Sequence, residues 1–139
     1  MGLENFRKAV YPMFASVMSV GAPTVTVAYD NHKFDQPDAG MWVYFALVPG
    51  ERRRITLGNQ PAFRLEGVLN IACMVKEDEG TGDLFAVVDT IITGMCDKEF
   101  ATDDGTAYTH SVRTANRGVV EGWFTINAKI EFRYDEQVY

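Results

Sequence analysis

The stretch VVEGWFTINAKIEFRY, residues Val119–Tyr134, alternates between two kinds of residue. Apolar residues or glycine occupy every second position from Val120 to Tyr134, and the positions between them are polar except for Trp123. Because successive side chains of a strand point to opposite faces of a sheet, this pattern predicts a strand with one buried face. At roughly 3.3 Å per residue it would be about 50 Å long, which is more than one small sheet usually needs. We therefore expect part of it to reach beyond the core of the subunit.

Two further stretches are predicted to be long strands of the same sheet. Ala107–Arg113 is expected to precede the last strand and to join it through Ala115–Gly118, where Asn and Gly supply the positive φ of a tight turn. Phe63–Val75 alternates as the last strand does, with Gly67 as a bulge or a point of close contact. The sequence therefore predicts a mostly antiparallel sheet with a long C-terminal hairpin.

The strand predicted at Met41–Val48 is apolar on both alternating faces. Such a strand needs a central place in the sheet, or helices on one side and a partner subunit on the other, and we favour the partner. A turn at Pro49–Glu51 is expected to lead into a return strand at Arg52–Gly58. Thr24–Tyr29 is predicted to be a short β-branched strand.

Two segments have apolar residues at helical spacing. Leu3–Ser19 predicts an amphipathic helix with Tyr11 on its outer side, and Pro12 is expected to kink it or delay its start, because an interior proline costs about 3 kcal/mol. Asp83–Met95 predicts a second helix. Together the elements predict an α+β fold, a single domain over residues 1–139, with the two helices packed on one face of the sheet.

The composition argues against several classes of protein. Thirteen Lys and Arg against nineteen Asp and Glu give a net charge of -6, which disfavours tight binding to nucleic-acid phosphates. Cys73 and Cys96 lack the spacing of a zinc motif or a disulfide framework, so we expect both to be buried and reduced. Neither a signal peptide nor a stretch of membrane-spanning length is present, so we expect a soluble protein made in the cytoplasm, with no membrane contact.

One local cluster could bind a metal or transfer protons, and it consists of Asp30, His32, Asp35 and Asp38. Such residues are also common in turn-rich loops, where their side chains cap backbone groups, and this interpretation is favoured. The second histidine, His110, lies in a predicted strand, and no nucleophile motif occurs. We therefore expect no catalytic residue, no metal and no cofactor, and a protein that is not an enzyme. A small metal-dependent or ligand-binding protein is the remote alternative.

Aromatic and basic residues on the strands are the candidates for an interface. Trp123 interrupts a polar strand face, so it is expected to anchor a protein interface or to pair with an aromatic side chain of its own subunit. The three adjacent arginines that begin at Arg52 either meet phosphates or an acidic partner, or pair with carboxylates nearby. We expect an oligomer or partner interface to include Trp42, Tyr44, Arg52, Arg53, Arg54, Trp123 and Arg133.

A series of short blocks along nearly the whole chain resembles the tail terminator-like proteins of tailed phages and prophages. The blocks are weak individually, but they occur in order and with similar spacing. They are Val27–Asn31, Phe34–Pro37, Trp42–Val43, Gly58–Pro61, Phe63–Arg64, Gly67, Gly80–Gly82, Ser111–Thr114, Asn116–Gly118, Gly122–Phe124 and Phe132–Glu136. Cys73–Lys76 and the second predicted helix depart from the family pattern, which leaves the partner-facing surface undefined.

The resemblance implies a structural virion protein and no enzyme. Such a subunit forms a closed homo-oligomeric ring, expected to be a hexamer, that terminates the tail tube. Its implied partners are copies of itself, the tail tube protein and the head-tail connector protein, and its location is the virion tail, after synthesis in the cytoplasm of the bacterial host. DNA is expected to pass through the lumen without specific binding, because an acidic lumen repels it. A head-completion or neck connector protein is the alternative, since the same fold and charge would serve it.

Overall fold

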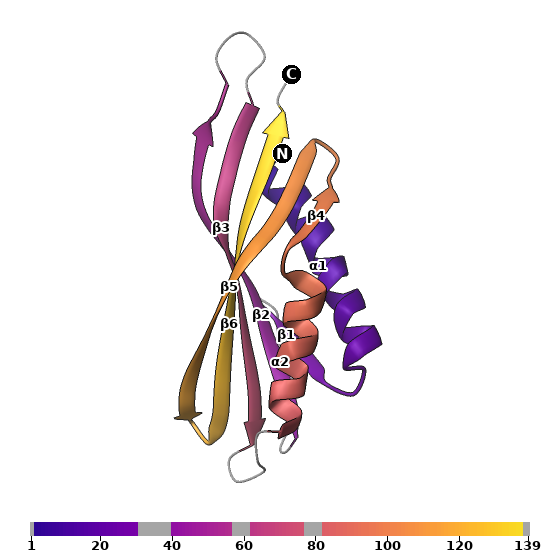
Figure 1. Ribbon diagram of the computed structural model, residues 1–139, viewed down its shortest axis with the longest axis vertical. Coiled ribbons are helices and arrows are strands. Elements are labelled where there is room, and N and C mark those ends of the chain that lie inside the picture. The colour runs from indigo at the N-terminus through magenta and orange to yellow at the C-terminus, as the bar shows by residue number, and fades with distance from the viewer. Residues whose placement is uncertain (1, 31–39, 57–61, 77–81, 138–139) are drawn as a thin grey trace.

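The computed structural model describes residues 2–30, 40–56, 62–76 and 82–137. Its elements in chain order are α1 (Gly2–Gly21), β1 (Thr26–Tyr29), β2 (Met41–Arg54), β3 (Ala62–Lys76), α2 (Gly82–Met95), β4 (Lys98–Ala101), β5 (Gly105–Val120) and β6 (Trp123–Gln137). The strands form one six-stranded sheet in the order β1-β2-β3-β6-β5-β4, in which β1 and β2 are parallel and the other pairs antiparallel. Both helices lie on the same side of this sheet (Figure 1). The predicted α+β fold with its long C-terminal hairpin is confirmed.

The two central strands form the floor of the core. On β6 every second residue from Ile126 to Tyr134 is buried, and the facing side of β3 buries Leu65, Leu69, Ile71, Cys73 and Val75. The helices cover this side, and Phe6 of α1 stacks on Phe132 with ring centroids 4.2 Å apart. The buried faces predicted for these strands and the second predicted helix are confirmed.

Gly67 is a point of close contact, which is one of the two roles that the sequence predicted for it. A Cβ atom at this position would lie 2.5 Å from the carbonyl oxygen of Val48 and 2.8 Å from the ring of Phe132. The register between β3 and β6 continues through Gly67 without a shift. The glycine therefore allows the strand to approach the core ring, and it does not mark a bulge in this pair.

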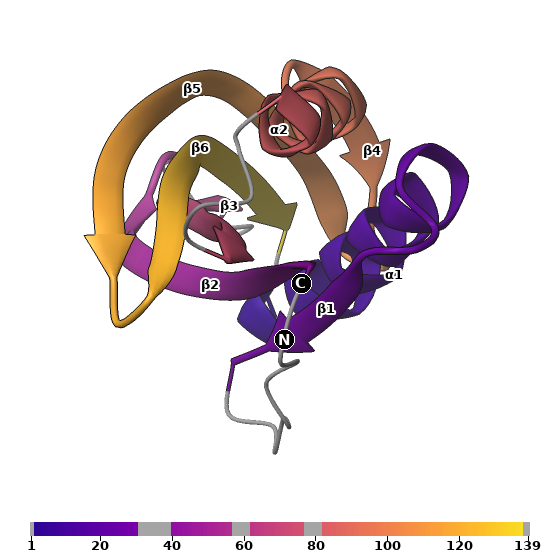
Figure 2. The same ribbon diagram turned by 90° about the horizontal axis from the view of Figure 1, so that it is seen from below.

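The sheet is twisted so strongly that β2 and β3 cross β5 and β6 in projection (Figure 1). The end of the β2–β3 pair projects at the top, and the turn between β5 and β6 projects at the lower left, away from the helices (Figure 1). Seen from below, the sheet curls until both edge strands, β1 and β4, lie beside α1 (Figure 2). The helices therefore fill the opening of a curled sheet, and both hairpin ends extend beyond them.

The turn predicted at Pro49–Glu51 is wrong, because β2 continues through it. The register of β2 against β3 shifts between Pro49 and Arg52, so these residues form a bulge. At this point β2 is an edge strand, because β1 pairs only with Trp42–Phe45, and proline is tolerated at edges and bulges. The return strand predicted at Arg52–Gly58 is also wrong, since β3 is the strand that pairs back onto β2.

The turn of the last hairpin lies further along the chain than predicted. β5 continues through Ala115–Gly118, where the register shifts and the N–H of Gly118 donates to the Asn116 side chain at 2.8 Å. The turn is made by Glu121 and Gly122, whose φ angles are 52° and 86°. A two-residue loop with both φ angles positive matches the twist of the flanking strands. The Asn and Gly that indicated a turn therefore build a bulge, and the hairpin is longer than expected.

Three smaller expectations differ from the structure, and one strand was not predicted. Tyr11 does not lie on the outer side of α1, because it packs against the core and stacks on Tyr29 with centroids 5.6 Å apart. Pro12 does not delay the start of α1, because the helix begins at Gly2 and continues through the exposed proline to Gly21. Cys73 is buried, but Cys96 is only partly buried, and its thiol donates to the carbonyl of His110 at 2.7 Å. The short, charged edge strand β4 was not predicted.

Candidate interaction surface

The sheet face opposite the helices, here called the helix-free face, carries several of the predicted interface residues. Trp42 and Tyr44 alternate along β2 with Val43 and Phe45, which are fully buried in the core. The first two therefore point to the helix-free face. Trp123 points the same way, because it alternates on β6 with the residues of the core. Together they place aromatic side chains at the end of this face where β2 and β6 begin.

Trp42 and Trp123 belong to a cavity of about 480 Å³, here called the tryptophan pocket, which is lined by Trp42, Met74, Arg117, Val120, Glu121, Trp123, Thr125 and Asn127. The two indole rings meet edge to face, with centroids 6.1 Å apart and an interplanar angle of 86°. Lys76 lies against one of them, with Nζ 5.0 Å from the centroid of the Trp123 ring. The structure thus contains the aromatic pair within one subunit that was one of the two interpretations of Trp123.

Polar side chains of β6 form one wall of the tryptophan pocket. Thr125 and Asn127 are both buried, although they belong to the alternating face that the sequence marks as polar. The hydroxyl of Thr125 donates to the carbonyl of Trp123 at 3.2 Å. Within the described part of the chain, the amide of Asn127 makes no side-chain hydrogen bond. The pocket therefore combines aromatic walls with an amide that is available to a partner's polar group.

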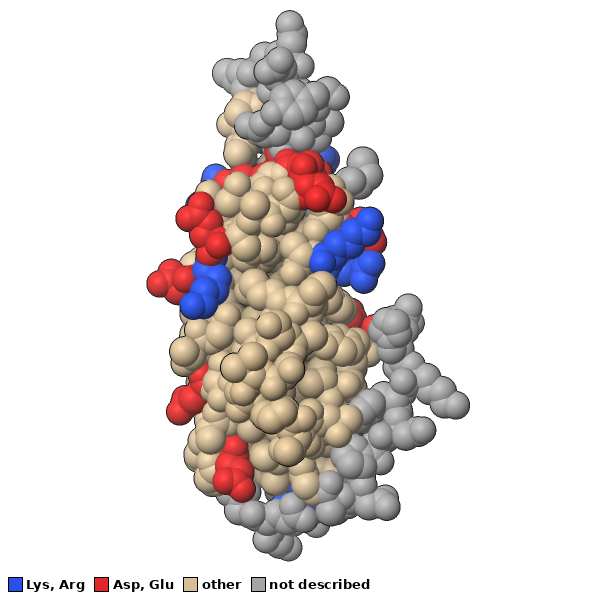
Figure 3. Space-filling view, turned by 90° about the vertical axis from the view of Figure 1, so that its right-hand side faces the viewer, with Lys and Arg blue, Asp and Glu red and all other residues tan. Residues whose placement is uncertain are grey.

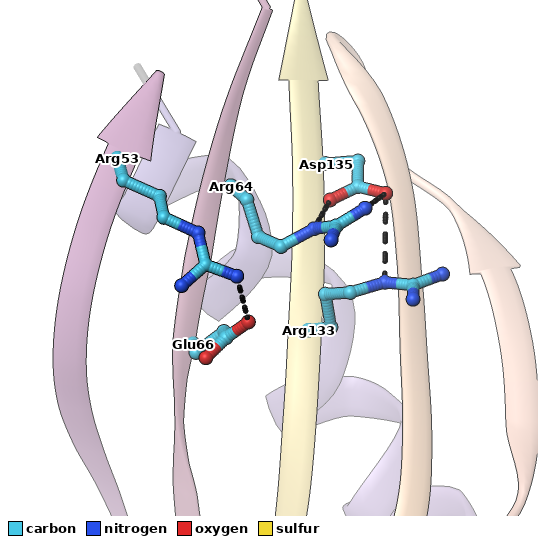
Figure 4. Close-up of polar contacts among 5 residues, drawn as sticks. All are labelled: Arg53, Arg64, Glu66, Arg133 and Asp135. Carbon is cyan, nitrogen blue, oxygen red and sulfur yellow. Dashed lines mark hydrogen bonds and ion pairs between the residues drawn. The ribbon is translucent and has the colours of Figure 1, made fainter. Parts of the chain in front are cut away.

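Charged residues form a ladder at the upper end of the helix-free face (Figure 4). Arg53 of β2 pairs with Glu66 of β3 at 3.1 Å, and Arg64 of β3 makes two hydrogen bonds to Asp135 of β6, at 2.8 and 3.2 Å. Arg133 adds an ion pair to Asp135 at 3.5 Å. The hydrogen bonds from Arg64 to Asp135 raise the pKa of the guanidinium. The ladder therefore joins three strands and leaves few of its charges unpaired.

The three adjacent arginines do not form one basic patch. Arg52 donates to the buried carboxylate of Glu136 at 2.6 Å and lies 3.9 Å from the centroid of the Phe63 ring. Arg53 joins the ladder, and the Nε of Arg54 donates to a backbone carbonyl at 2.7 Å. Of the two interpretations of the three arginines, these contacts favour pairing with groups nearby over contact with phosphates or an acidic partner.

The cluster that was considered, and disfavoured, as a metal or acid-base site lies mostly outside the described residues, which include Asp30 but not His32, Asp35 or Asp38. The carboxylate of Asp30 accepts a hydrogen bond from the hydroxyl of Tyr11. Burial and this carboxylate raise the pKa of the Tyr11 phenol. Among the residues that the structure describes, no group of three or more His, Cys, Asp or Glu could hold a metal ion.

Most residues of the tryptophan pocket carry no signal in the sequence that marks them as a site. Met74, Arg117 and Asn127 come from three strands, and each is an ordinary strand residue when taken alone. The strand register brings Trp42 opposite Met74 and Met74 opposite Thr125, and the curl of the sheet then brings the hairpin end over them. The interruption of a polar face by Trp123 was the one local signal, and it indicated the correct face.

Comparisons with known proteins describe the fold. No protein-family model matches the chain, and no curated protein matches it in sequence. A solved structure whose name states no function is similar with a TM-score of 0.73 and 18% identity, covering 100% of this chain and 98% of that chain. A chain of the virion of a native gene transfer agent particle is similar with a TM-score of 0.61 and 15% identity, covering 98% of this chain and 97% of that chain. Among the described residues, none of the helices is long and apolar enough to cross a membrane.

Proposed function

We propose that this chain is a structural subunit of a phage-like particle and not an enzyme. In this proposal it forms the ring that terminates the tail tube and joins it to the head-side connector. The observation that carries the proposal is the whole-length likeness to a chain of a gene transfer agent virion, which covers 98% of this chain and 97% of that one. The sequence blocks that resemble tail terminator-like proteins support, independently, a position in the tail of such a particle, where the tube meets the head-side connector.

The helix-free face supports a role in assembly. Antiparallel sheets with helices on one side leave the other side open to solvent or to a partner. Here that side combines the half-buried Trp42 and Tyr44 with the exposed Val48 and the charged ladder. A mixture of aromatic, aliphatic and arginine side chains is typical of protein interfaces. We therefore place the contacts with the tail tube protein and the connector protein on this face.

The charge of the chain fits a ring around a DNA channel. A net charge of -6 per copy, multiplied in a hexamer, gives a strongly negative ring. Phosphates would be repelled from its inner surface, so DNA would slide through without specific binding. The same charge and fold would also suit a head-completion or neck connector protein, and only the position in the particle separates these two roles.

The location of the protein in the particle tests the proposal. A version with an affinity tag, made in the bacterium that produces the particles, would be followed by gold-labelled antibody and negative-stain microscopy of purified particles. We expect one cluster of label where the tail meets the head-side connector. Label within the head-side neck would favour the alternative, and absence of the protein from intact particles would contradict both.

The metal-dependent alternative has its own test, which is metal analysis of the purified protein. We expect less than about one tenth of an equivalent of any transition metal, since structural and catalytic sites bind stoichiometrically. One equivalent of zinc or manganese would revive the cluster around Asp30 as a functional site.

A further inference from the structure

The outer side of the two helices carries an apolar groove, here called the helix groove. It has a volume of about 530 Å³ and runs between the C-terminal halves of α1 and α2. Val20 on its rim is 84% exposed, and Phe85 on the same helix layer is 49% exposed. Asp89 lines the groove and is exposed. Charged side chains gather at the upper end and the margins of this side of the molecule, and its middle is uncharged (Figure 3).

The end of the β5–β6 hairpin has complementary properties. Val119 and Val120 are 55% and 46% exposed, and Arg117 beside them is exposed as well. Further along the hairpin, Arg113 lies directly opposite Lys129 in the register, and like charges in such a pair repel each other. Within the described part of the chain, none of these three basic side chains makes an ion pair. The hairpin end is therefore an apolar projection whose three unpaired cations outnumber, among the described residues, the one unpaired acid of its turn, Glu121.

We propose that the hairpin end of one copy docks in the helix groove of a second copy of this chain. Val119 and Val120 would then pack near Val20 and Phe85, and Arg117 would face Asp89. This inference rests on the ring assembly proposed above and specifies its subunit contact. The contact leaves Trp42, Tyr44 and the charged ladder of the helix-free face available to the other partners, although Arg117 and Val120 also line the tryptophan pocket.

Charge complementarity argues for a second copy as the occupant. Most surfaces of a chain with net charge -6 repel one another, so a copy must meet its neighbour where one side is locally basic. The hairpin end supplies Arg113, Arg117 and Lys129, and the exposed side of α2 supplies Asp83 and Asp89, which form no ion pairs within the described residues. Both halves of the contact are thus present on one chain.

The positions of the two surfaces determine the kind of assembly. The hairpin end projects on the side away from the helices in both views of the ribbon (Figures 1 and 2). A contact between two different surfaces of the same chain is head to tail, and it closes into a ring if the rotation between neighbours divides a full turn. The proposed contact therefore gives a ring without requiring a symmetric dimer.

Reversal of the two facing charges tests the contact. Analytical ultracentrifugation of the full chain over a range of concentrations at low salt would compare the unchanged protein with Arg117→Glu, Asp89→Arg and the double variant. We expect the unchanged chain to associate, each single reversal to raise the apparent dissociation constant at least about tenfold, and the double variant to restore association. Lys8→Glu, an equal charge reversal on the exposed side of α1 near its start, is the matched control and should have no effect.

An apolar pair of variants supports the same test. Phe85→Ala should weaken association, whereas Leu3→Ala, at another exposed apolar residue of the helix layer, should not. Thermal unfolding of each variant would show that the fold is retained, because all these side chains are at the surface.

The outcomes separate this inference from the proposed function. Association that is unaffected by the single reversals, or not restored in the double variant, would overturn the contact and leave the ring proposal standing. A chain that stays monomeric at every concentration, with or without purified tail tubes, would overturn the contact as well. In that case the gold-label experiment still decides whether the protein belongs to the particle.

Discussion

Gly67 lies where β3 passes closest to the neighbouring backbone and to Phe132, so it gives a direct test of the core. Gly67→Ala would place a methyl group 2.5 Å from the carbonyl oxygen of Val48. We expect a loss of about 1–3 kcal/mol in the free energy of unfolding, because the strands must move apart. Urea denaturation measures it. Gly82→Ala is the control, since a Cβ there meets nothing within 4 Å, and a loss as small as the control's would contradict the close contact.

Two neighbouring arginines should differ in their effect on stability. Arg52 neutralises Glu136, which is 2% exposed, whereas Arg53 pairs with the exposed Glu66. Arg52→Ala leaves a buried carboxylate without its cation and should cost about 1–3 kcal/mol, a value reduced because Arg52 itself is half exposed. Arg53→Ala should cost less than about 1 kcal/mol. Urea denaturation compares the two variants, and equal losses in the free energy of unfolding would show that the burial of Glu136 does not affect the strength of its ion pair.

The two cysteines should differ in reactivity. Burial raises the pKa of the Cys73 thiol to about 12, so at pH 8 it is protonated and enclosed. We expect iodoacetamide to modify the partly exposed Cys96 first and Cys73 only after unfolding, as mass spectrometry would show. Rapid native modification of Cys73 would contradict its burial.

The Cys73 thiol keeps its proton in the folded protein at a pH where an unfolded cysteine, with a pKa of about 8.5, has lost it. The contribution of this thiol to the free energy of unfolding should therefore decline as the pH rises from about 8.5 toward 12.

At the scale of elements, the turn between β5 and β6 predicts a stabilising substitution. Glu121 adopts a φ of 52°, which strains a side chain of this kind, and Gly122 follows with 86°. Glu121→Asn should stabilise the fold by about 0.5–1 kcal/mol, because Asn-Gly is the preferred pair in this turn. Thermal unfolding compares it with Glu99→Asn on β4, where no gain is expected. Equal stability of the two variants would contradict the strain inferred for the backbone of Glu121.

The elements that sequence analysis predicted well are those whose signal is local. Alternation along β3 and β6 identified the buried face of each strand, because the period of a strand depends only on neighbouring residues. Pro49 with Gly50 and Asn116 with Gly118 carry turn residues but form bulges, since the register with neighbouring strands decides between the two outcomes. β4 was missed because it is short and is held mainly by β5.

The candidate surface was predicted only in part for the same reason. Trp42 and Trp123 were singled out as individual residues, but they lie on strands separated by β3, so only the folded register brings them together. The ladder around Asp135 likewise requires three strands in register. Distances between strands far apart in the sequence are not encoded in any short pattern.

At the scale of the whole molecule, the sheet should be unequally stable along its length. The middle of β6 is paired on both sides and covered by helices, whereas residues 113–117 of β5 are exposed and lie on an open edge. We expect amide hydrogens around Ile130 to exchange at least about a hundredfold more slowly than those of residues 113–117 in dilute protein. Exchange followed by mass spectrometry measures this. Uniform exchange would contradict the projecting hairpin, and slower exchange of its end in concentrated protein would follow from the proposed contact.

Long stretches of strand edge are left without a neighbour in the described chain, on β2 beyond Phe45 and on β5 beyond Thr109. Such edges are templates on which another extended peptide can add, and they invite fibril growth. Pro49 and the arginines that follow it disfavour strand addition at the edge of β2, and Arg113 and Arg117 disfavour it at the edge of β5. Two copies that approach by either edge bring cations together, so the protein should resist fibril formation in dilute buffer. It should be most prone to filamentous precipitation in concentrated salt, where those cations are screened.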